Sequence, residues 1–100
     1  MLYNKLVRDK IPDVIKANGD EAIFHVAGDE EYYEKLKEKV LEEFNEFVED
    51  ESPEEFVDLM EVLDAIAEYI GFDKAQLEAI RRAKNEKRGA FKGRIILDES

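Results

Sequence analysis

The stretch from Asp29 to Gly71 most constrains the fold, because it contains two helix-length amphipathic segments separated by a short turn. Apolar residues recur at helical spacing in each segment and so form one stripe per helix. The stripes are Tyr33, Leu36, Val40, Phe44 and Phe47, then Phe56, Leu59, Leu63, Ile66 and Ile70. Between them, Ser52-Pro53-Glu54-Glu55 has the pattern of an N-cap, a proline in the first helical position and a capping-box glutamate. The sequence therefore predicts a helical hairpin over about Asp29–Glu49 and Ser52–Ile70.

The flanking residues predict a mostly α single domain over residues 1–100. Ile11-Pro12 opens a short helix that ends at Asn18-Gly19, and Asp73 starts a fourth helix that ends near Arg88-Gly89. Residues 22–26 and 91–97 are expected to be strands that pair in a small β-ribbon. Apolar residues also lie off the main stripes of the hairpin, at Leu41, Val48, Val57 and Met60. A second packing surface of this kind favours a homodimer or higher homo-oligomer that completes a four-helix bundle.

Composition and charge exclude several classes of protein. The chain has no cysteine, so it has neither disulfides nor a thiolate zinc site. It contains no apolar run long enough to span a membrane, and its N-terminus is too polar for a signal peptide, so a cytoplasmic protein is expected. A net charge of −11 disfavours nucleic acid as the main partner, because phosphate backbones would be repelled. The basic residues cluster between Arg81 and Arg94, which fits either an anionic ligand or charge complementarity between packed segments.

The acidic residues of the hairpin raise the question of a metal site. Glu43 falls inside the apolar arc of its helix, where an ionised carboxylate is costly unless it is paired or bound to metal. Glu46 lies on the flank of the same arc. On the next helix, Glu55 lies at the edge of the apolar arc and Asp58 lies just outside it. Two antiparallel helices would bring these four carboxylates together. Without histidine or cysteine among them, they suit Mg²⁺ or Mn²⁺ rather than zinc.

Periodicity alone is also compatible with roles for these carboxylates that involve no metal. Lys39 lies on the same flank as Glu43 and could neutralise it. Glu55 could serve only as the capping-box partner of Ser52. Glu61 and Asp64 repeat the three-residue spacing on the far side of the stripe, where the sequence favours solvated or interfacial side chains.

Three blocks of the chain resemble one family of enzymes. Glu42-Glu43-x-x-Glu46 followed by Glu55-x-x-Asp58 resembles the EExxE…ExxD pattern of the all-α, MazG-like nucleoside triphosphate pyrophosphatases. The N-terminal block Tyr3-Asn4-Lys5-Leu6-Val7-Arg8-Asp9-Lys10-Ile11-Pro12 and the tail Lys84-x-x-Lys87-Arg88-Gly89-x-Phe91 resemble a subfamily described as phosphoribosyl-ATP pyrophosphohydrolase-like or house-cleaning. The interval between Glu46 and Glu55 is shorter than in many relatives, so Glu61 and Asp64 form an alternative ExxD pair.

The resemblance implies metal-dependent hydrolysis of a nucleoside triphosphate to the monophosphate and pyrophosphate. Carried over by position, Glu43, Glu46, Glu55 and Asp58 would hold Mg²⁺ or Mn²⁺, and Glu42, beside Glu43, would orient the attacking water. Cations must then meet the remaining phosphate charge, and the candidates are Arg8, Lys10, Lys84, Lys87 and Arg88. The alternatives are a phosphoribosyl-ATP pyrophosphohydrolase and a dimeric helical interaction or regulatory module without enzymatic activity.

Overall fold

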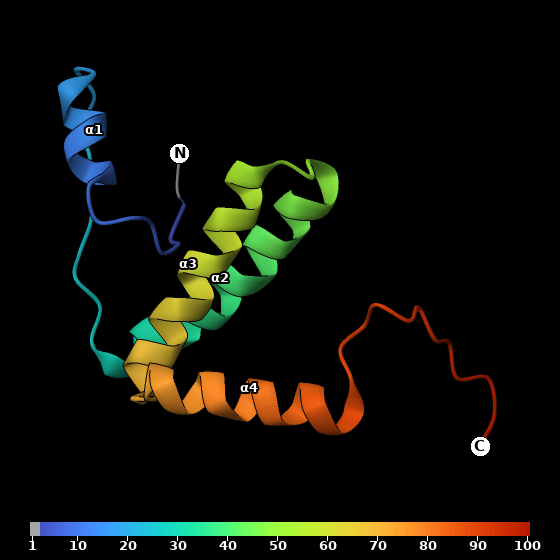
Figure 1. Ribbon diagram of the computed structural model, residues 1–100. Coiled ribbons are helices and arrows are strands. Elements are labelled where there is room, and N and C mark those ends of the chain that lie inside the picture. Colours follow the sequence, from blue (N-terminus) through green and yellow to red (C-terminus); the bar gives the residue numbers. More distant parts are fainter. Residues whose placement is uncertain (1–2) are drawn as a thin grey trace. The chain divides into compact units, whose positions relative to one another are not determined.

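The computed structural model describes residues 3–100 (Figure 1). The chain forms two compact units, Met1–Ile70 and Gly71–Ser100. The first unit contains α1 (Ile11–Ala17), α2 (Asp29–Glu49) and α3 (Pro53–Ile70), and the second contains α4 (Lys74–Arg88). All four helices agree with the sequence predictions, so the mostly α fold class is confirmed. None of the described helices has the length and apolar character needed to cross a membrane.

Local capping explains where these helices begin and end. Asp29, Glu30 and Glu31 place three acids in the first turn of α2, where the helix dipole favours negative charge. Asp73 caps α4 by accepting a hydrogen bond from the backbone N–H of Ala75 at 3.3 Å. Gly71, directly after α3, has φ +91°, a left-handed conformation that stops a helix at little cost only in glycine.

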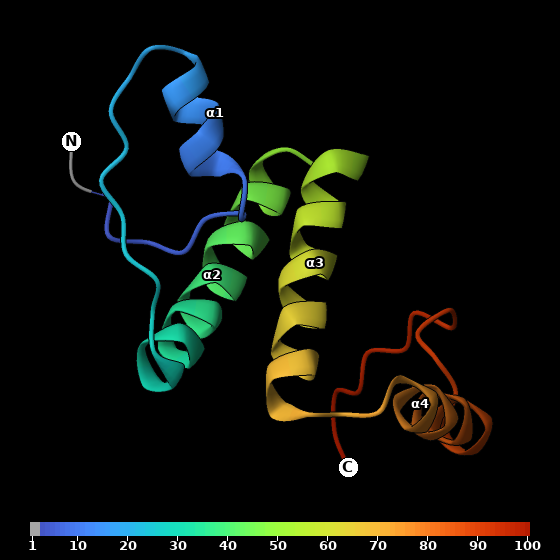
Figure 2. The ribbon, with the colours of Figure 1, turned by 90° about the vertical axis from the view of Figure 1, so that its left-hand side faces the viewer.

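Helices α2 and α3 lie side by side as an antiparallel hairpin (Figures 1 and 2). Aromatic contacts join the two helices at both ends. Tyr69 stacks on Tyr33 with ring centroids 5.1 Å apart at one end, and Phe47 meets Phe56 edge-to-face at 5.5 Å near the turn. Leu36 is the one fully buried apolar side chain among the described residues. The hairpin thus has a defined helix pairing but a very small core.

A broad apolar surface of the hairpin remains exposed. Half or more of the surface of several large side chains is open on both helices: Leu41, Phe44 and Val48 on α2, and Val57, Met60 and Leu63 on α3. We call these six residues the open apolar face. It includes every position that sequence periodicity places off the stripes. Phe44 and Leu63 belong to the predicted inward stripes, so the apolar surface is wider than one stripe per helix.

The predicted β-ribbon is wrong, because residues 3–100 contain no strand. Residues 22–26 have no regular secondary structure, and residues 91–93 form a bend and a turn. Ile23, Val26, Phe91 and Ile95 each expose most of their surface. Local β-propensity alone does not stabilise two short strands, since a two-stranded ribbon without a covered face is marginal in water.

Candidate metal centre

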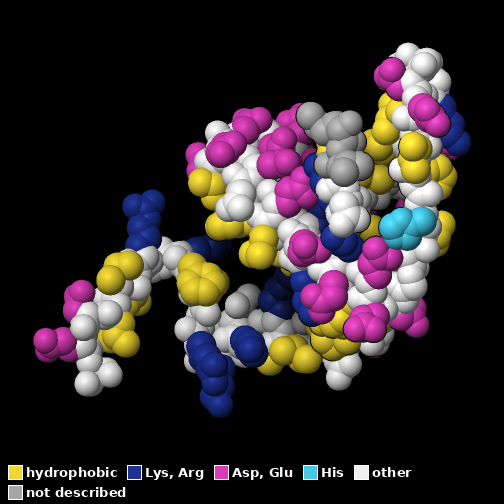
Figure 3. Space-filling model, turned by 180° about the vertical axis from the view of Figure 1, so that it is seen from behind, with side chains coloured by type: hydrophobic (Ala, Val, Ile, Leu, Met, Phe, Trp, Pro, Cys, Tyr) yellow, Lys and Arg dark blue, Asp and Glu magenta, His cyan; other side chains and the backbone are white. Residues whose placement is uncertain are grey.

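Three carboxylates from the two helices of the hairpin meet near its turn. Glu43 on α2 and Glu55 and Asp58 on α3 each offer an oxygen, and these oxygens lie within 4.8 Å of one another. We call these three residues the acid cluster. Acidic side chains crowd the surface of the hairpin more widely (Figure 3). The acid cluster differs from this exposed charge, because parts of it are withdrawn from water.

Glu43 is the most deeply placed of the three. It is only 6% exposed and is the buried charged residue among those described. Its Oε1 lies 3.3 Å from Nζ of Lys39, whereas its Oε2 is buried and has no hydrogen-bond partner. Burial raises the pKa of Glu43, and repulsion from Glu46 adds to this, although the hydrogen bond from Lys39 opposes it. The periodicity argument for an inward Glu43 therefore holds, and Lys39 neutralises it only on one side.

Glu55 takes part in the helix cap through its backbone and not through its side chain. Its N–H donates to Oγ of Ser52 at 3.3 Å, as expected for an N-cap. The N–H of Ser52 donates to the backbone oxygen of Asp50 at 2.7 Å, so it does not need the Glu55 carboxylate. Oε2 of Glu55 is buried without a partner, and burial together with the charges of Asp58 and Glu43 raises its pKa. The reciprocal half of the capping box is absent, so the cap does not occupy this carboxylate.

Asp58 forms an ion pair with an arginine of the N-terminal segment. Its Oδ1 accepts a hydrogen bond from the guanidinium of Arg8 at 2.6 Å, a contact that joins residues 50 positions apart in the chain. Glu46, the fourth predicted ligand, is exposed and is not one of the three clustered acids. It lies close enough to Glu43 to affect its pKa, so it lines the edge of the acid cluster.

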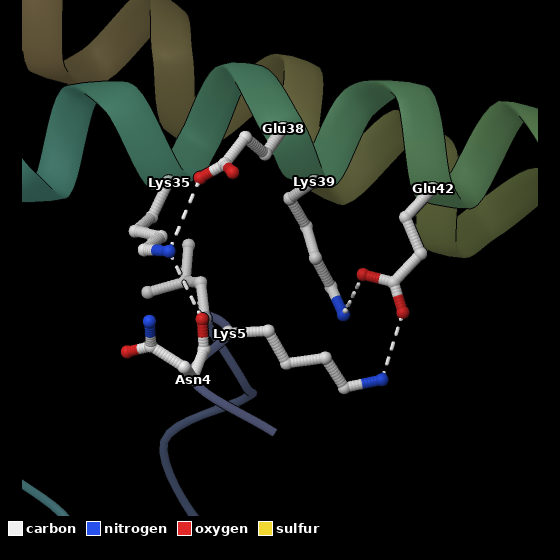
Figure 4. A pocket seen from close by; sticks show the side chains of 7 residues that line it. Asn4, Lys5, Lys35, Glu38, Lys39 and Glu42 are labelled. Carbon is white, nitrogen blue, oxygen red and sulfur yellow. Dashed lines mark hydrogen bonds and ion pairs between the residues drawn. The ribbon is translucent and has the colours of Figure 1, made fainter. Parts of the chain in front are cut away.

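Glu42 lines a small hollow between α2 and the N-terminal segment (Figure 4). Its two oxygens accept hydrogen bonds from Lys5 at 2.8 Å and from Lys39 at 3.1 Å. Burial opposes the ionisation of Glu42, but the two lysines outweigh it and lower the pKa. Glu42 is thus firmly ionised, and Lys39 connects it to Glu43.

The remaining predicted residues lie outside the acid cluster. Lys10 is exposed and immediately precedes α1. Glu61 and Asp64, the alternative pair, are exposed on α3. Lys84, Lys87 and Arg88 are exposed in the last turns of α4, in the second unit. Sequence reasoning missed the contact of Lys5 with Glu42, because an irregular segment has no period from which such a contact can be read.

The acid cluster fits a hard divalent cation. It offers oxygen donors only, the ligand type that Mg²⁺ and Mn²⁺ prefer, and Glu43 and Glu55 each have one buried oxygen without a hydrogen-bond partner. Glu46 stands at its edge as a fourth carboxylate. Comparison of the chain with protein-family models, with curated proteins and with solved structures finds no match in any of the three.

The raised pKa of Glu43 predicts a pH-dependent stability that a glutamine at this position removes. In the unfolded chain Glu43 ionises near its ordinary value of 4.5, whereas in the folded protein it keeps its proton to higher pH. Between these two values the folded state binds more protons, so the stability of the wild type falls as pH rises. Without divalent metal, the melting temperature of Glu43→Gln should therefore approach that of the wild type below about pH 4.5, exceed it by a growing margin up to the raised pKa of folded Glu43, and keep a constant margin above that pH. Thermal unfolding across pH in a chelating buffer measures this difference, and a gap that does not change with pH would contradict the assignment.

Proposed function

We propose that this chain is a metal-dependent nucleoside triphosphate pyrophosphohydrolase that cleaves the bond between the α and β phosphates to give a nucleoside monophosphate and pyrophosphate. The observation that carries the proposal is the burial of Glu43 within the acid cluster, with its Oε2 left without a hydrogen-bond partner. Burying a carboxylate that is only half paired costs stability, and a bound divalent cation would offset that cost. The proposal also rests on the resemblance of three sequence blocks to the MazG-like pyrophosphatases.

Each carboxylate has a distinct part in this proposal. Glu43, Glu55 and Asp58 would hold Mg²⁺ or Mn²⁺, with Glu46 as a fourth ligand at the open edge. When bound, the metal would neutralise charge that develops on the phosphates. Glu42 would orient the attacking water as an ionised acceptor, a state that its contacts with Lys5 and Lys39 favour.

Substrate phosphates need cations beside the metal, because the hairpin itself is strongly acidic. Arg8 and Lys10 of the N-terminal segment are the candidates within the first unit. Further candidates come from the basic segment of the second unit: Lys84, Lys87 and Arg88. Only the sequence supports a phosphate-binding role for these three residues. A planar guanidinium such as that of Arg8 suits phosphate oxygens better than an ammonium does, since it donates two parallel hydrogen bonds.

We also propose that the protein works as a homodimer or higher homo-oligomer. With Leu36 as the one fully buried apolar side chain among the described residues, a single hairpin buries too little to be stable alone. Covering the open apolar face with the same face of a second copy would create the four-helix core that one chain lacks. The same observation favours the second candidate function, a dimeric interaction or regulatory module in which the carboxylates only solvate the helices.

A nucleotide panel separates these functions. The purified chain is expected to release pyrophosphate, and no inorganic phosphate, from at least one nucleoside triphosphate or from phosphoribosyl-ATP with Mg²⁺ or Mn²⁺. A chelator should abolish the release, because without metal the acidic hairpin repels a triphosphate. Preference within the panel distinguishes a general nucleotide substrate from phosphoribosyl-ATP. Absence of turnover on the whole panel with either metal would favour the interaction module.

A further inference from the structure

The N-terminal segment, residues 3–10, is fastened to the hairpin at three points. Nζ of Lys35 donates to the backbone oxygen of Asn4 at 2.9 Å, and Lys5 pairs with Glu42 at 2.8 Å. Both of these contacts are with α2 (Figure 4). The third contact, from Arg8 to Asp58 at 2.6 Å, is the one of the three that reaches α3. Arg8 therefore holds the far part of the segment against the helix that supplies two of the three clustered acids.

Arg8 and a divalent cation would compete for the same carboxylate. Asp58 is a member of the acid cluster, and its Oδ1 is already hydrogen-bonded to the guanidinium. Mg²⁺ requires near-octahedral geometry with oxygens at about 2.0–2.1 Å, which leaves little freedom for a ligand that is also held by a cation. The guanidinium and the metal also repel each other at such short range. Neither Glu43 nor Glu55 has a comparable arginine contact, so the competition falls on Asp58.

We propose that Arg8 is an exchangeable counter-ion of the acid cluster, and that binding of the divalent metal displaces it from Asp58 and loosens the N-terminal segment. This inference rests on the metal site of the proposed function and adds a regulation of that site. Linkage makes the effect reciprocal: the Arg8–Asp58 pair weakens metal binding by the same factor by which bound metal weakens the pair. Lys5 and Lys35 keep their contacts with α2. The segment therefore opens at Arg8 and remains anchored at Asn4 and Lys5.

Direct Mn²⁺ binding to the full chain tests this competition. Arg8→Gln is expected to lower the Kd for Mn²⁺ about two- to fivefold in calorimetric titration, the range expected when one exposed ion pair no longer has to be broken. Lys16→Gln is the matched control, since it removes one positive charge from α1, where the Lys16 ammonium lies near the Phe24 ring and not at the acid cluster. Its Kd should equal that of the wild type. Arg8→Lys keeps the positive charge but loses the planar guanidinium. Its Kd for Mn²⁺ should lie between that of Arg8→Gln and that of the wild type.

Hydrogen exchange distinguishes displacement from a merely electrostatic influence of Arg8. Saturating Mg²⁺ should speed amide exchange around Arg8 in the wild type, while amides of α2 and α3 exchange more slowly. Equal Kd values for Arg8→Gln and Lys16→Gln, or slower exchange around Arg8 with metal, would overturn the counter-ion role and leave the metal site intact. Failure of every variant and of the wild type to bind Mn²⁺ would instead overturn the proposed function and this inference together.

Discussion

Glu43→Gln is expected to abolish metal-dependent pyrophosphate release and at the same time to make the metal-free protein more stable. Glutamine keeps the shape of the side chain but removes the charge that a divalent cation needs. Loss of a direct ligand should reduce turnover by at least about a hundredfold, since even residues that only support metal ligands cost about 10- to 100-fold. Pyrophosphate release at saturating Mg²⁺ and Mn²⁺ binding by calorimetry measure the loss.

The gain in stability separates this result from simple misfolding. The mutant no longer buries a carboxylate whose Oε2 has no partner, and Lys39 keeps its contact with Glu42 at 3.1 Å. We therefore expect the free energy of unfolding without metal to rise by about 1 kcal/mol at neutral pH. Added Mn²⁺ should stabilise the wild type and not the mutant, because only a folded state that binds the ion gains from it.

Glu61→Gln is the matched control on α3. It removes the same charge from an exposed residue outside the acid cluster, so turnover and stability should both stay close to wild type. A loss of turnover in Glu61→Gln equal to that in Glu43→Gln would show that the alternative acids of α3 hold the metal. Retained turnover in Glu43→Gln would remove the central ligand from the proposed site.

Val57→Glu should disrupt the assembly of the protein and unfold much of the hairpin. Val57 lies on the open apolar face, where the proposed second copy would bury the new carboxylate without a partner. If burying this unpaired carboxylate costs roughly 3 kcal/mol, the dissociation constant of the assembly rises at least about a hundredfold. Sedimentation equilibrium should show monomers at concentrations where the wild type is a dimer or larger, and circular dichroism should show lost helicity in those monomers.

Val26→Glu controls for the chemical change itself. Val26 is 90% exposed in the irregular segment before α2, so the same substitution there should alter neither the association state nor the helicity. A wild type that sediments as a monomer with full helicity would contradict the need for a second copy. Equal effects of the two substitutions would mean that the open apolar face has no special role.

Local rules predict the helices well, because their ends depend on residues close in sequence. Asp73 caps the start of α4, and Gly71 ends α3, each through backbone contacts or conformation within a few residues. The start of α3 follows from Ser52 and Pro53. The burial of Glu43 is predictable for the same reason, since the angle between residues on one helix is fixed by the helix itself. The residues that no local rule could place are those of the N-terminal segment, whose contacts with the hairpin span 31 to 50 positions.

The predicted strands and the predicted capping box fail for physical reasons. Branched and aromatic side chains favour a strand locally, but a strand also needs a paired neighbour and a covered face. The capping-box pattern at Ser52 and Glu55 indicates a reciprocal pair of hydrogen bonds, of which only one forms. Asp50 supplies the backbone oxygen that takes the N–H of Ser52, and no pattern of side chains could reveal this.

The cap at Ser52 has a consequence for how substitutions in this protein would be tolerated. Its hydroxyl binds the backbone of Glu55, while the side chain of the same glutamate remains available to the acid cluster. One uncharged residue thus sets the position of a carboxylate that it never touches. Selection that preserves the carboxylate would therefore also preserve a capping residue (serine, threonine, aspartate or asparagine) three positions before it, although that residue takes no part in the chemistry.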